Sequence, residues 1–326
     1  MKVAVLGVGG IGKTHIDNLK AIEGVEIVSI CDVSPGAEAL AKELGATCFA
    51  DCSAMLEASP AEVVLICTPT FLHEEQVRAV LEAGKHCICE KPLCLKSAQA
   101  KALFALAREK GVLLHVAHVL HFWEEYAILR EIVQKGQYGR VVDANFVRLT
   151  ERPTWSASGW LFDPEKSGVL PFDLHTHDLY YLIGILGRPK IGYIQTEGQP
   201  QVLEYLRVCY EFPTATACAE ASWYHAPIPF TQRFRVYFEK AVAEFDGDCL
   251  MLYAAGEEAK KLGSDSKEVG IETSINVSPT TAYLKELEHF FDCIRRGSPS
   301  EIVTEEQVVD TLETLEELVE MAAKGK

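Results

Sequence analysis

The chain has 326 residues, 48% of them hydrophobic, and carries a formal net charge of −16. Its length predicts about two domains, and its composition is that of a globular protein with a sizeable core. The negative charge argues against a nucleic-acid partner, which needs a basic face, and against an anionic membrane surface. A neutral small molecule therefore fits best as the substrate.

The lack of a recognisable membrane span or signal peptide, together with the positions of the cysteines, favours a cytoplasmic protein. No apolar run reaches the roughly 20 residues of a membrane span, and glycines interrupt the N-terminal MKVAVLGVGG too early for a signal peptide. Most of the eleven cysteines lie in apolar runs, as Cys31 and Cys67 do, where cysteine packs as a small hydrophobe. Cys87, Cys89 and Cys94 cluster but lack the paired spacing of a zinc site. We expect no metal, and reduced thiols.

Short apolar runs alternate with amphipathic stretches in the first 120 residues. Strands are predicted at 2–6, 26–31, 47–49, 63–67, 86–89 and 112–116, and helices at 11–21, 36–44, 73–83 and 97–110. Apolar strands separated by helices indicate a parallel sheet covered on both faces. We therefore predict a doubly wound α/β Rossmann domain over residues 1–121.

The pattern changes in the second half, which we assign to one α+β domain over residues 122–326. The expected elements are helices at 127–135, 170–186, 281–295 and 304–324, strands at 141–150, 202–212, 215–225, 233–239 and 242–246, and a loop at 151–170. Long consecutive strands predict a large open, mainly antiparallel sheet with helices on one side. The last helix is expected to pack back on the first domain. A sheet with one uncovered face tends to pair with a copy of itself, so we expect a homo-oligomer.

A glycine-rich turn follows the first predicted strand. Gly7, Gly9 and Gly12 form G-x-G-G-x-G directly before a helix, and Gly10 and Ile11 lie inside the same motif. The three glycines permit a tight turn, close approach of a pyrophosphate and close helix–strand packing, while the helix N-terminus attracts the anion. This context predicts a dinucleotide site.

Asp32 ends the second strand, about 20 residues past the last glycine, where a carboxylate binds the ribose hydroxyls. It repels a 2′-phosphate, and Val33, Ser34 and Pro35 supply no compensating cation. NAD is therefore favoured over NADP.

The end of the fourth strand gives a second candidate contact with the cofactor. Thr68, Pro69 and Thr70 follow this strand, and His73 begins the next helix. Ligands of open α/β sheets lie beyond the carboxyl ends of the strands, so this turn should lie near the ribose and nicotinamide.

Four motifs together resemble the Gfo/Idh/MocA family, the glucose–fructose oxidoreductase and inositol dehydrogenase superfamily. They are GVGGIGKTH at 7–15, CTPTFLH at 67–73, AGKHCICEKPL at 83–93 and GVLPFDLHTHDLYYLIGILG at 168–187. The resemblance covers nearly the whole chain. It implies an NAD-dependent oxidoreductase that forms homodimers or homotetramers through the sheet of its second domain.

Carried over by position, Glu90, Lys91 and Pro92 match the E-K-P motif of the family, whose lysine lies between nicotinamide and substrate. An ammonium group can stabilise the alkoxide that forms as hydride leaves. Asp173 and His177 match the D-x-x-x-H motif, whose histidine is the general base. Imidazole suits this task because its ordinary pKa is about 6.5. On spacing alone, the Asp–His pair could instead have a structural role and stabilise the surface between the two domains.

The chain also departs from the family pattern. The segment VAHVLHFWEEY at 116–126 has His121 and Glu124 where relatives often have arginine and proline. We expect His118, His121 and Trp160 to contact the substrate together with Lys91, Asp173 and His177, although packing in the core explains each of the first three equally well.

The resulting function is transfer of hydride between nicotinamide and a ring hydroxyl or ketone of a sugar, glycoside or cyclic polyol, with the substrate in an interdomain cleft. Two alternatives stay open. One is the same site with tightly retained NAD and transient sugar oxidation, and the other is a non-catalytic regulatory protein that responds to NAD or sugar.

Overall fold

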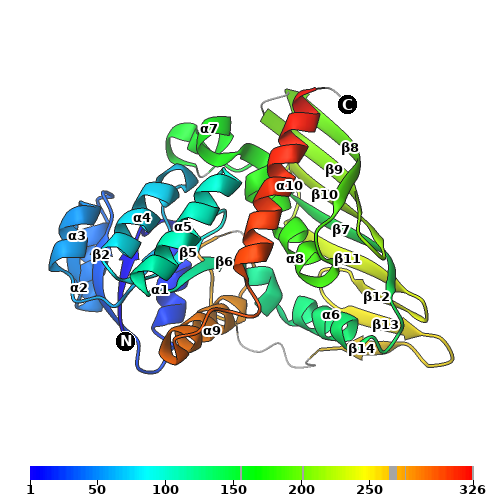
Figure 1. Cartoon of the computed structure of the whole chain (residues 1–326), viewed down its shortest axis with the longest axis horizontal. Helices are drawn as coiled ribbons and strands as arrows, with labels where there is room; N and C mark the ends of the chain where they lie inside the picture. The colour runs from blue at the N-terminus through cyan, green and yellow to red at the C-terminus, as the bar shows by residue number, and fades with distance from the viewer. Residues whose placement is uncertain (155, 200–201, 264–269, 276, 325–326) are drawn as a thin grey trace. The chain divides into compact units, whose positions relative to one another are not determined.

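Two structural units make up the chain in the computed structural model, which describes residues 1–154, 156–199, 202–263, 270–275 and 277–324 (Figure 1). Unit 1 comprises Met1–Cys94, Ala98–Val119 and Glu268–Glu305, and unit 2 comprises Leu95–Ser97, Leu120–Lys267 and Glu306–Lys326.

The expected domain ranges 1–121 and 122–326 differ from these units because a late segment returns to unit 1. The returning helix is α9 (Ala282–Arg296), whereas the last helix, α10 (Glu305–Ala323), lies almost wholly in unit 2. Leu287, Phe290 and Phe291 of α9 are fully buried, so apolar burial explains the return.

Unit 1 contains a six-stranded sheet in the order β3-β2-β1-β4-β5-β6. Its strands are β1 (Lys2–Leu6), β2 (Glu26–Cys31), β3 (Thr47–Phe49), β4 (Val63–Ile66), β5 (His86–Glu90) and β6 (Leu114–Ala117). Every neighbouring pair is parallel. The strand order reverses between β1 and β4, so right-handed crossovers place helices on both faces, as in a Rossmann fold.

The helices that accompany this sheet follow the prediction with one addition. They are α1 (Gly10–Leu19), α2 (Ala37–Leu44), α3 (Cys52–Ala58), α4 (His73–Glu82) and α5 (Ser97–Lys110), together with a short 3₁₀ turn at Thr70–Leu72. The sequence prediction missed α3, which has seven residues and buries only Met55. Its start is marked by Asp51, whose side chain accepts a hydrogen bond from the amide of Ala54.

Unit 2 contains an eight-stranded sheet in the order β14-β13-β12-β11-β7-β10-β9-β8. Its strands are β7 (Val141–Glu151), β8 (Lys190–Gln199), β9 (Val202–Glu211), β10 (Thr216–Tyr224), β11 (Thr231–Phe238), β12 (Ala241–Phe245), β13 (Leu250–Ala254) and β14 (Lys260–Leu262). All neighbouring pairs are antiparallel except β7 and β10. The predicted mainly antiparallel sheet is confirmed.

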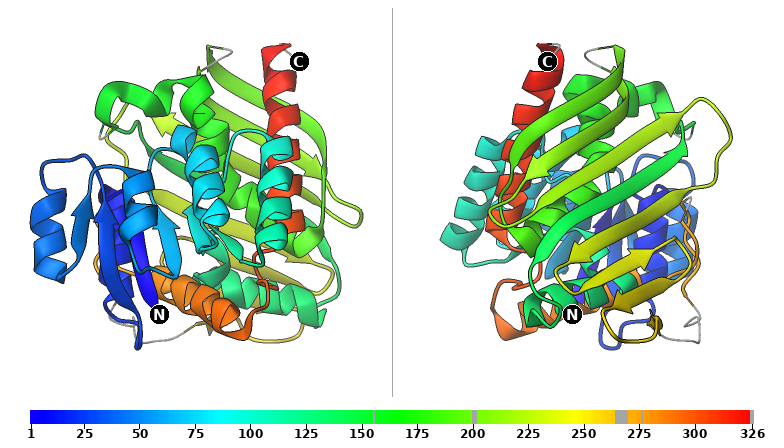
Figure 2. Two further views of the ribbon diagram at one scale, coloured as in Figure 1. Left: turned by 60° about the vertical axis from the view of Figure 1, so that its left-hand side comes forward. Right: turned by 90° about the vertical axis from the view of Figure 1, so that its right-hand side faces the viewer.

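Helices of unit 2 gather on one face of this sheet, as Figure 2 shows for α6 (Glu124–Lys135), α8 (Thr176–Leu186) and α10. Burial alternates accordingly along β11, whose Phe234, Val236 and Phe238 are buried while the residues between them are exposed. The expected loop at 151–170 contains a 3₁₀ segment, Ala157–Phe162, and the one-turn helix α7 (Pro164–Ser167). Within the described ranges, no helix is both long and apolar enough to span a membrane.

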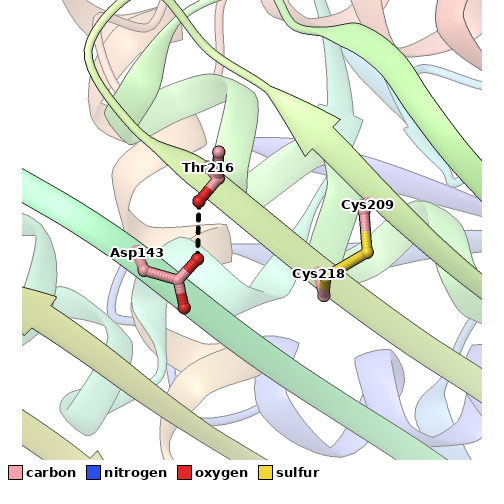
Figure 3. The surroundings of a disulfide bond; sticks show 4 residues. All are labelled: Asp143, Cys209, Thr216 and Cys218. Carbon is pink, nitrogen blue, oxygen red and sulfur yellow. Dashed lines mark hydrogen bonds between the residues drawn. A yellow bond between two sulfur atoms is a disulfide. The ribbon is translucent and has the colours of Figure 1, made fainter.

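Two cysteines of unit 2 form a disulfide, so the expectation of reduced thiols is wrong for this pair. Cys209 of β9 and Cys218 of β10 are direct partners in the antiparallel register, with their Cα atoms 4.2 Å apart (Figure 3). Nearby, Thr216 donates a hydrogen bond to Asp143 at 2.6 Å, across β10 and β7. Strand register determines which cysteines face each other, and spacing along the sequence does not reveal it.

Candidate functional site

The glycine-rich turn joins β1 to α1 in unit 1. Gly7 has a φ of +93°, and a Cβ on it would lie 2.8 Å from the backbone of Cys67. A Cβ on Gly12 would lie 2.2 Å from the carbonyl oxygen of Gly7. Both positions need glycine because the turn and the helix pack closely here. Gly9 differs, since its Cβ would meet nothing within 4 Å, which leaves its backbone open to a ligand.

The first turn of α1 presents uncapped amides. Gly10 and Ile11 begin the helix, and its N-cap, Gly9, has no side chain to accept their hydrogen bonds. Such an N-terminus attracts a phosphate group. A segment that the sequence prediction missed lies against this turn: a Cβ on Gly10 would lie 2.8 Å from the carbonyl oxygen of Ser274. The amide of Ser274 donates to Oγ1 of Thr14 at 2.9 Å.

Asp32 follows the last residue of β2 and closes the turn. Its Oδ2 accepts a hydrogen bond from the amide of Val8 at 2.7 Å, and its Oδ1 accepts one from the amide of Ser34 at 2.6 Å. Partial burial alone would raise the pKa of Asp32, but these hydrogen bonds outweigh it and lower the pKa below its ordinary value. The carboxylate is therefore ionised at neutral pH, as recognition of a ribose diol requires.

His73 connects the turn after β4 to the turn after β5. Thr68 and Pro69 are half-buried, whereas Thr70 and His73 are buried. The ring nitrogens of His73 lie 2.8 Å from the carbonyl oxygen of Pro92 and 2.8 Å from that of Thr68. Burial lowers the pKa of His73, so the ring is neutral and donates to one carbonyl at a time. Its role within unit 1 is to connect the two turns.

Glu90 holds the backbone of Lys91. Its Oε1 lies 2.6 Å from Nε2 of His15 in α1, and its Oε2 accepts a hydrogen bond from the amide of Lys91 at 3.1 Å. Glu90 is 8% exposed, Lys91 is half-buried, and the peptide bond between Lys91 and Pro92 is cis. The carboxylate thus supports the turn from inside unit 1.

Asp173 and His177 lie on one face of the helical segment before and within α8. A π-helical turn, Pro171–His175, precedes α8, so the predicted helix over 170–186 is not uniform. Among residues 167–183, Asp173 and His177 alone are half-buried and all others are buried. A spacing of four residues places their side chains on neighbouring turns. π-Helical turns occur frequently at functional sites.

An ion pair that the sequence prediction missed fixes α8 to the sheet of unit 2. Arg148 of β7 donates to Asp178 through Nε at 2.9 Å and through Nη2 at 2.8 Å. It also donates to Gln232 at 3.0 Å and to the hydroxyl of Tyr126 at 3.3 Å. Burial alone would lower the pKa of Arg148, but Asp178 and Tyr126 raise it above its ordinary value. Because Asp178 follows His177 in α8, this pair anchors the helix that carries the predicted base.

The other residues predicted to contact the substrate differ in exposure. His118 is buried beyond β6, and Trp160 is half-buried in the 3₁₀ segment of unit 2. His121 is 1% exposed and packs edge-on against Tyr180, with its ring centroid 5.4 Å away. Burial, reinforced by Arg130, lowers the pKa of His121 to about 3. His121 is therefore a neutral, buried side chain, and its contact with the substrate stays a prediction.

Two family models match the chain. Residues 1–118 match the model described as "Oxidoreductase family, NAD-binding Rossmann fold", and residues 126–244 match the "GFO/IDH/MocA C-terminal domain". The two matches correspond to unit 1 and unit 2 in chain order, apart from the late segment that returns to unit 1.

Curated relatives include several dehydrogenases. The 4-carboxy-2-hydroxymuconate-6-semialdehyde dehydrogenase of a Sphingobium species is 35% identical over 42% of this chain and 44% of its own length. The D-glucoside 3-dehydrogenase of Escherichia coli is 32% identical over 59% of this chain and 55% of its own length. The match thus spans about half the length of these relatives. The scyllo-inositol 2-dehydrogenase (NAD(+)) of Bacillus subtilis is 27% identical over 96% of this chain and 91% of its own length.

The whole chain also superposes on solved structures. A levoglucosan dehydrogenase in complex with NADH and levoglucosan has a TM-score of 0.86 and 20% identity, covering 100% of this chain and 98% of that one. This likeness establishes the fold. The two family models together show that the chain belongs to the Gfo/Idh/MocA family of oxidoreductases, and that its first unit is an NAD-binding Rossmann domain.

Proposed function

We propose that the protein transfers hydride between NAD and a ring hydroxyl or ketone of a sugar, glycoside or cyclic polyol. The observation that carries this proposal is the exposure pattern of the helical segment over residues 167–183, in which Asp173 and His177 alone are half-buried. A buried scaffold that leaves only an acid and a base accessible is suited to proton transfer. Relatives whose names specify inositol and glucoside dehydrogenases support the substrate class.

The residues of unit 1 fit NAD. The open position at Gly9, the uncapped start of α1 and the ionised Asp32 match a pyrophosphate and a ribose diol. When bound there, NAD supplies the hydride acceptor. Gly10 and Ile11 contribute helix amides, and Asp32 disfavours the 2′-phosphate of NADP.

Three residues carry the chemistry in this proposal. His177 accepts the proton of the reacting hydroxyl at a ring nitrogen, while the attached carbon loses hydride. Lys91 donates a hydrogen bond to the reacting oxygen and stabilises its developing negative charge. Asp173 orients the hydroxyl beside His177. His118 and Trp160 are proposed to shape the pocket around the substrate.

A panel assay tests this function. The purified protein is mixed with NAD, and separately with NADP, against inositols, free sugars and glycosides, and reduced nicotinamide is followed by its near-ultraviolet absorbance. We expect turnover with NAD and one of these classes. Cofactor that co-purifies and changes redox state without net turnover would instead favour transient oxidation with retained NAD. The absence of both signals with every substrate would overturn the proposal.

We also propose that the uncovered face of the sheet in unit 2 pairs with a second copy of the chain. Tyr193, Tyr237 and Tyr253 are 57%, 42% and 45% exposed. The strand register places all three on the sheet face that also carries the disulfide of Cys209 and Cys218. Exposed aromatic residues are enriched at protein interfaces. We expect sedimentation as a dimer or tetramer, and a stable monomer at micromolar concentration would refute this part.

A cytoplasmic location completes the proposal. All eleven cysteines lie in the described ranges, and nine of them are free, as is typical of a compartment that keeps thiols reduced. The disulfide of Cys209 and Cys218 is the one exception among the eleven cysteines. Alkylation of intact cells followed by mass spectrometry measures the state of the nine free cysteines, and disulfides among them would argue against the location.

A further inference from the structure

Four polar atoms in unit 1 are buried without a partner where α1 meets α9. They are Nδ1 of His15, Oδ1 of Asn18 and both carboxyl oxygens of Glu286, and none of them makes a hydrogen bond within the described part of the chain. His15 and Glu286 are 0% exposed and Asn18 is 1% exposed. Unsatisfied buried polar atoms are costly and rare, and several together indicate ordered water.

These atoms belong to facing surfaces of the two helices. His15 and Asn18 are three residues apart in α1, and Tyr283 and Glu286 are three residues apart in α9, so each pair shares one helix face. The ring of Tyr283 meets that of His15 edge-on, with centroids 5.6 Å apart. Glu286 therefore lies one helical turn along α9 from Tyr283, the residue that contacts His15.

Glu286 is also close to the carboxylate that supports Lys91. Burial, reinforced by the charge of Glu90, raises the pKa of Glu286 well above its ordinary value. Burial likewise raises the pKa of the Cys67 thiol, with smaller contributions from Glu90 and Glu286. Both carboxyl groups therefore face the same interior region at the end of β4. Burial, and then the neighbouring carboxylate, favour the protonated form of Glu286.

We propose that ordered water between α1 and α9 links the carboxyl of Glu286 to His15 and Asn18, and that this buried network positions Lys91. Each donor in this network faces an acceptor. The neutral acid of Glu286 donates to the water, the water donates to Nδ1 of His15, and Nε2–H of His15 donates to Glu90. The second oxygen of Glu90 accepts from the amide of Lys91, as already seen at 3.1 Å.

Glu286 is thus a positioning residue that acts through His15 and Glu90. Its role for catalysis rests on the proposed function of Lys91, but its protonation and the bound water do not. The substitution Glu286→Gln keeps a donor group and an acceptor group, as a protonated acid has, whereas Glu286→Leu leaves neither. The inference therefore predicts different outcomes for the two substitutions.

The kinetic test compares Glu286→Gln, Glu286→Leu and the control Glu288→Leu, which changes an exposed carboxylate of the same helix. We expect E286L to lower kcat about tenfold or more while the Kd for NAD and the unfolding midpoint stay near those of wild type. E286Q should restore most of the turnover, and E288L should match wild type. Equal kcat values for wild type and E286L, or equal losses in E286L and E286Q, would overturn the proposal.

Two further measurements test the network without depending on enzymatic activity. Infrared spectra should contain the carbonyl stretch of a protonated carboxylic acid in wild type and E288L, and this band should disappear in E286Q. Crystal structures of the NAD complexes should place water beside Glu286 in wild type, and should show the water lost and the backbone of Lys91 displaced in E286L. An absent band or a dry interface overturns the network. Inactive wild type with both features present overturns the proposed function alone.

Discussion

Replacing the buried arginine of unit 2 should cost more stability than replacing it together with its partner. The side chains of Arg148 and Asp178 are only 3% and 2% exposed and form a bidentate pair. Arg148→Met leaves the carboxylate of Asp178 buried without its cation, and Asp178→Leu leaves the guanidinium without its anion. An unpaired buried charge is far more costly than two well-packed apolar side chains.

Each single substitution is expected to lower the free energy of unfolding by about 3–5 kcal/mol. The double variant R148M/D178L removes both charges and loses only the hydrogen bonds to Gln232 and Tyr126, about 2 kcal/mol in total. At roughly 2–4 °C per kcal/mol, each single variant should melt roughly 6–20 °C below wild type. The double variant should therefore be more stable than either single one.

Urea unfolding followed by tryptophan fluorescence measures these differences, because Trp223 is 1% exposed in β10 of the same unit. Arg235→Met is the matched control, since its ion pair with Glu244 joins neighbouring strands of the same sheet but is 51% and 39% exposed. It should cost less than about 1 kcal/mol. The reasoning is refuted by a double variant that loses the sum of the single losses, or by a single variant that loses less than about 1 kcal/mol.

Three further predictions concern the cofactor site and acid stability. Asp32→Ala should weaken NAD binding about tenfold and improve the relative affinity for NADP, as calorimetry would measure; an unchanged preference contradicts the assigned role. Gly12→Ala should abolish NAD binding, because the new Cβ would lie 2.2 Å from the carbonyl oxygen of Gly7; full binding would disprove this close packing. Burial lowers the pKa values of His121 and His175 to about 3, so the unfolded chain binds more protons than the native one between pH 6.5 and 3. The free energy of unfolding should have its full value above pH 6.5. As the pH drops toward 3, it should fall by more than about 1 kcal/mol per pH unit for each histidine. A urea midpoint that stays constant over this pH range would exclude the effect.

Local sequence patterns were sufficient for most of unit 1 because its buried parallel strands are continuous apolar runs. The strands at Lys2–Leu6, Glu26–Cys31 and Thr47–Phe49 have the predicted bounds, and the doubly wound parallel sheet followed from their alternation with helices. In unit 2 the prediction missed β8, β13 and β14, and the sequence of β14, KKL, has too few residues to show a period. Pairing with β13 stabilises it instead.

The features that support the candidate site could not be predicted, because they depend on contacts distant in sequence. Arg148 and Asp178 are 30 residues apart, and Glu90 and His15 are 75 apart. No period or spacing connects such pairs. Glu286 similarly reads as an ordinary charged residue of an amphipathic helix, and only the packing of α9 on α1 shows that it is buried. The disulfide likewise required the register of β9 and β10.

The central claim is that Lys91 and His177 act in the chemical step. Its most direct test measures kcat and the Kd for NAD in Lys91→Met and His177→Ala, with His225→Ala as the control because His225 is exposed and pairs with Glu204 at 2.8 Å. Both site variants should lose about 100-fold or more in kcat while NAD binding stays within a few-fold of wild type, and H225A should remain active. Wild-type turnover in K91M or H177A, with NAD bound normally, would contradict the claim.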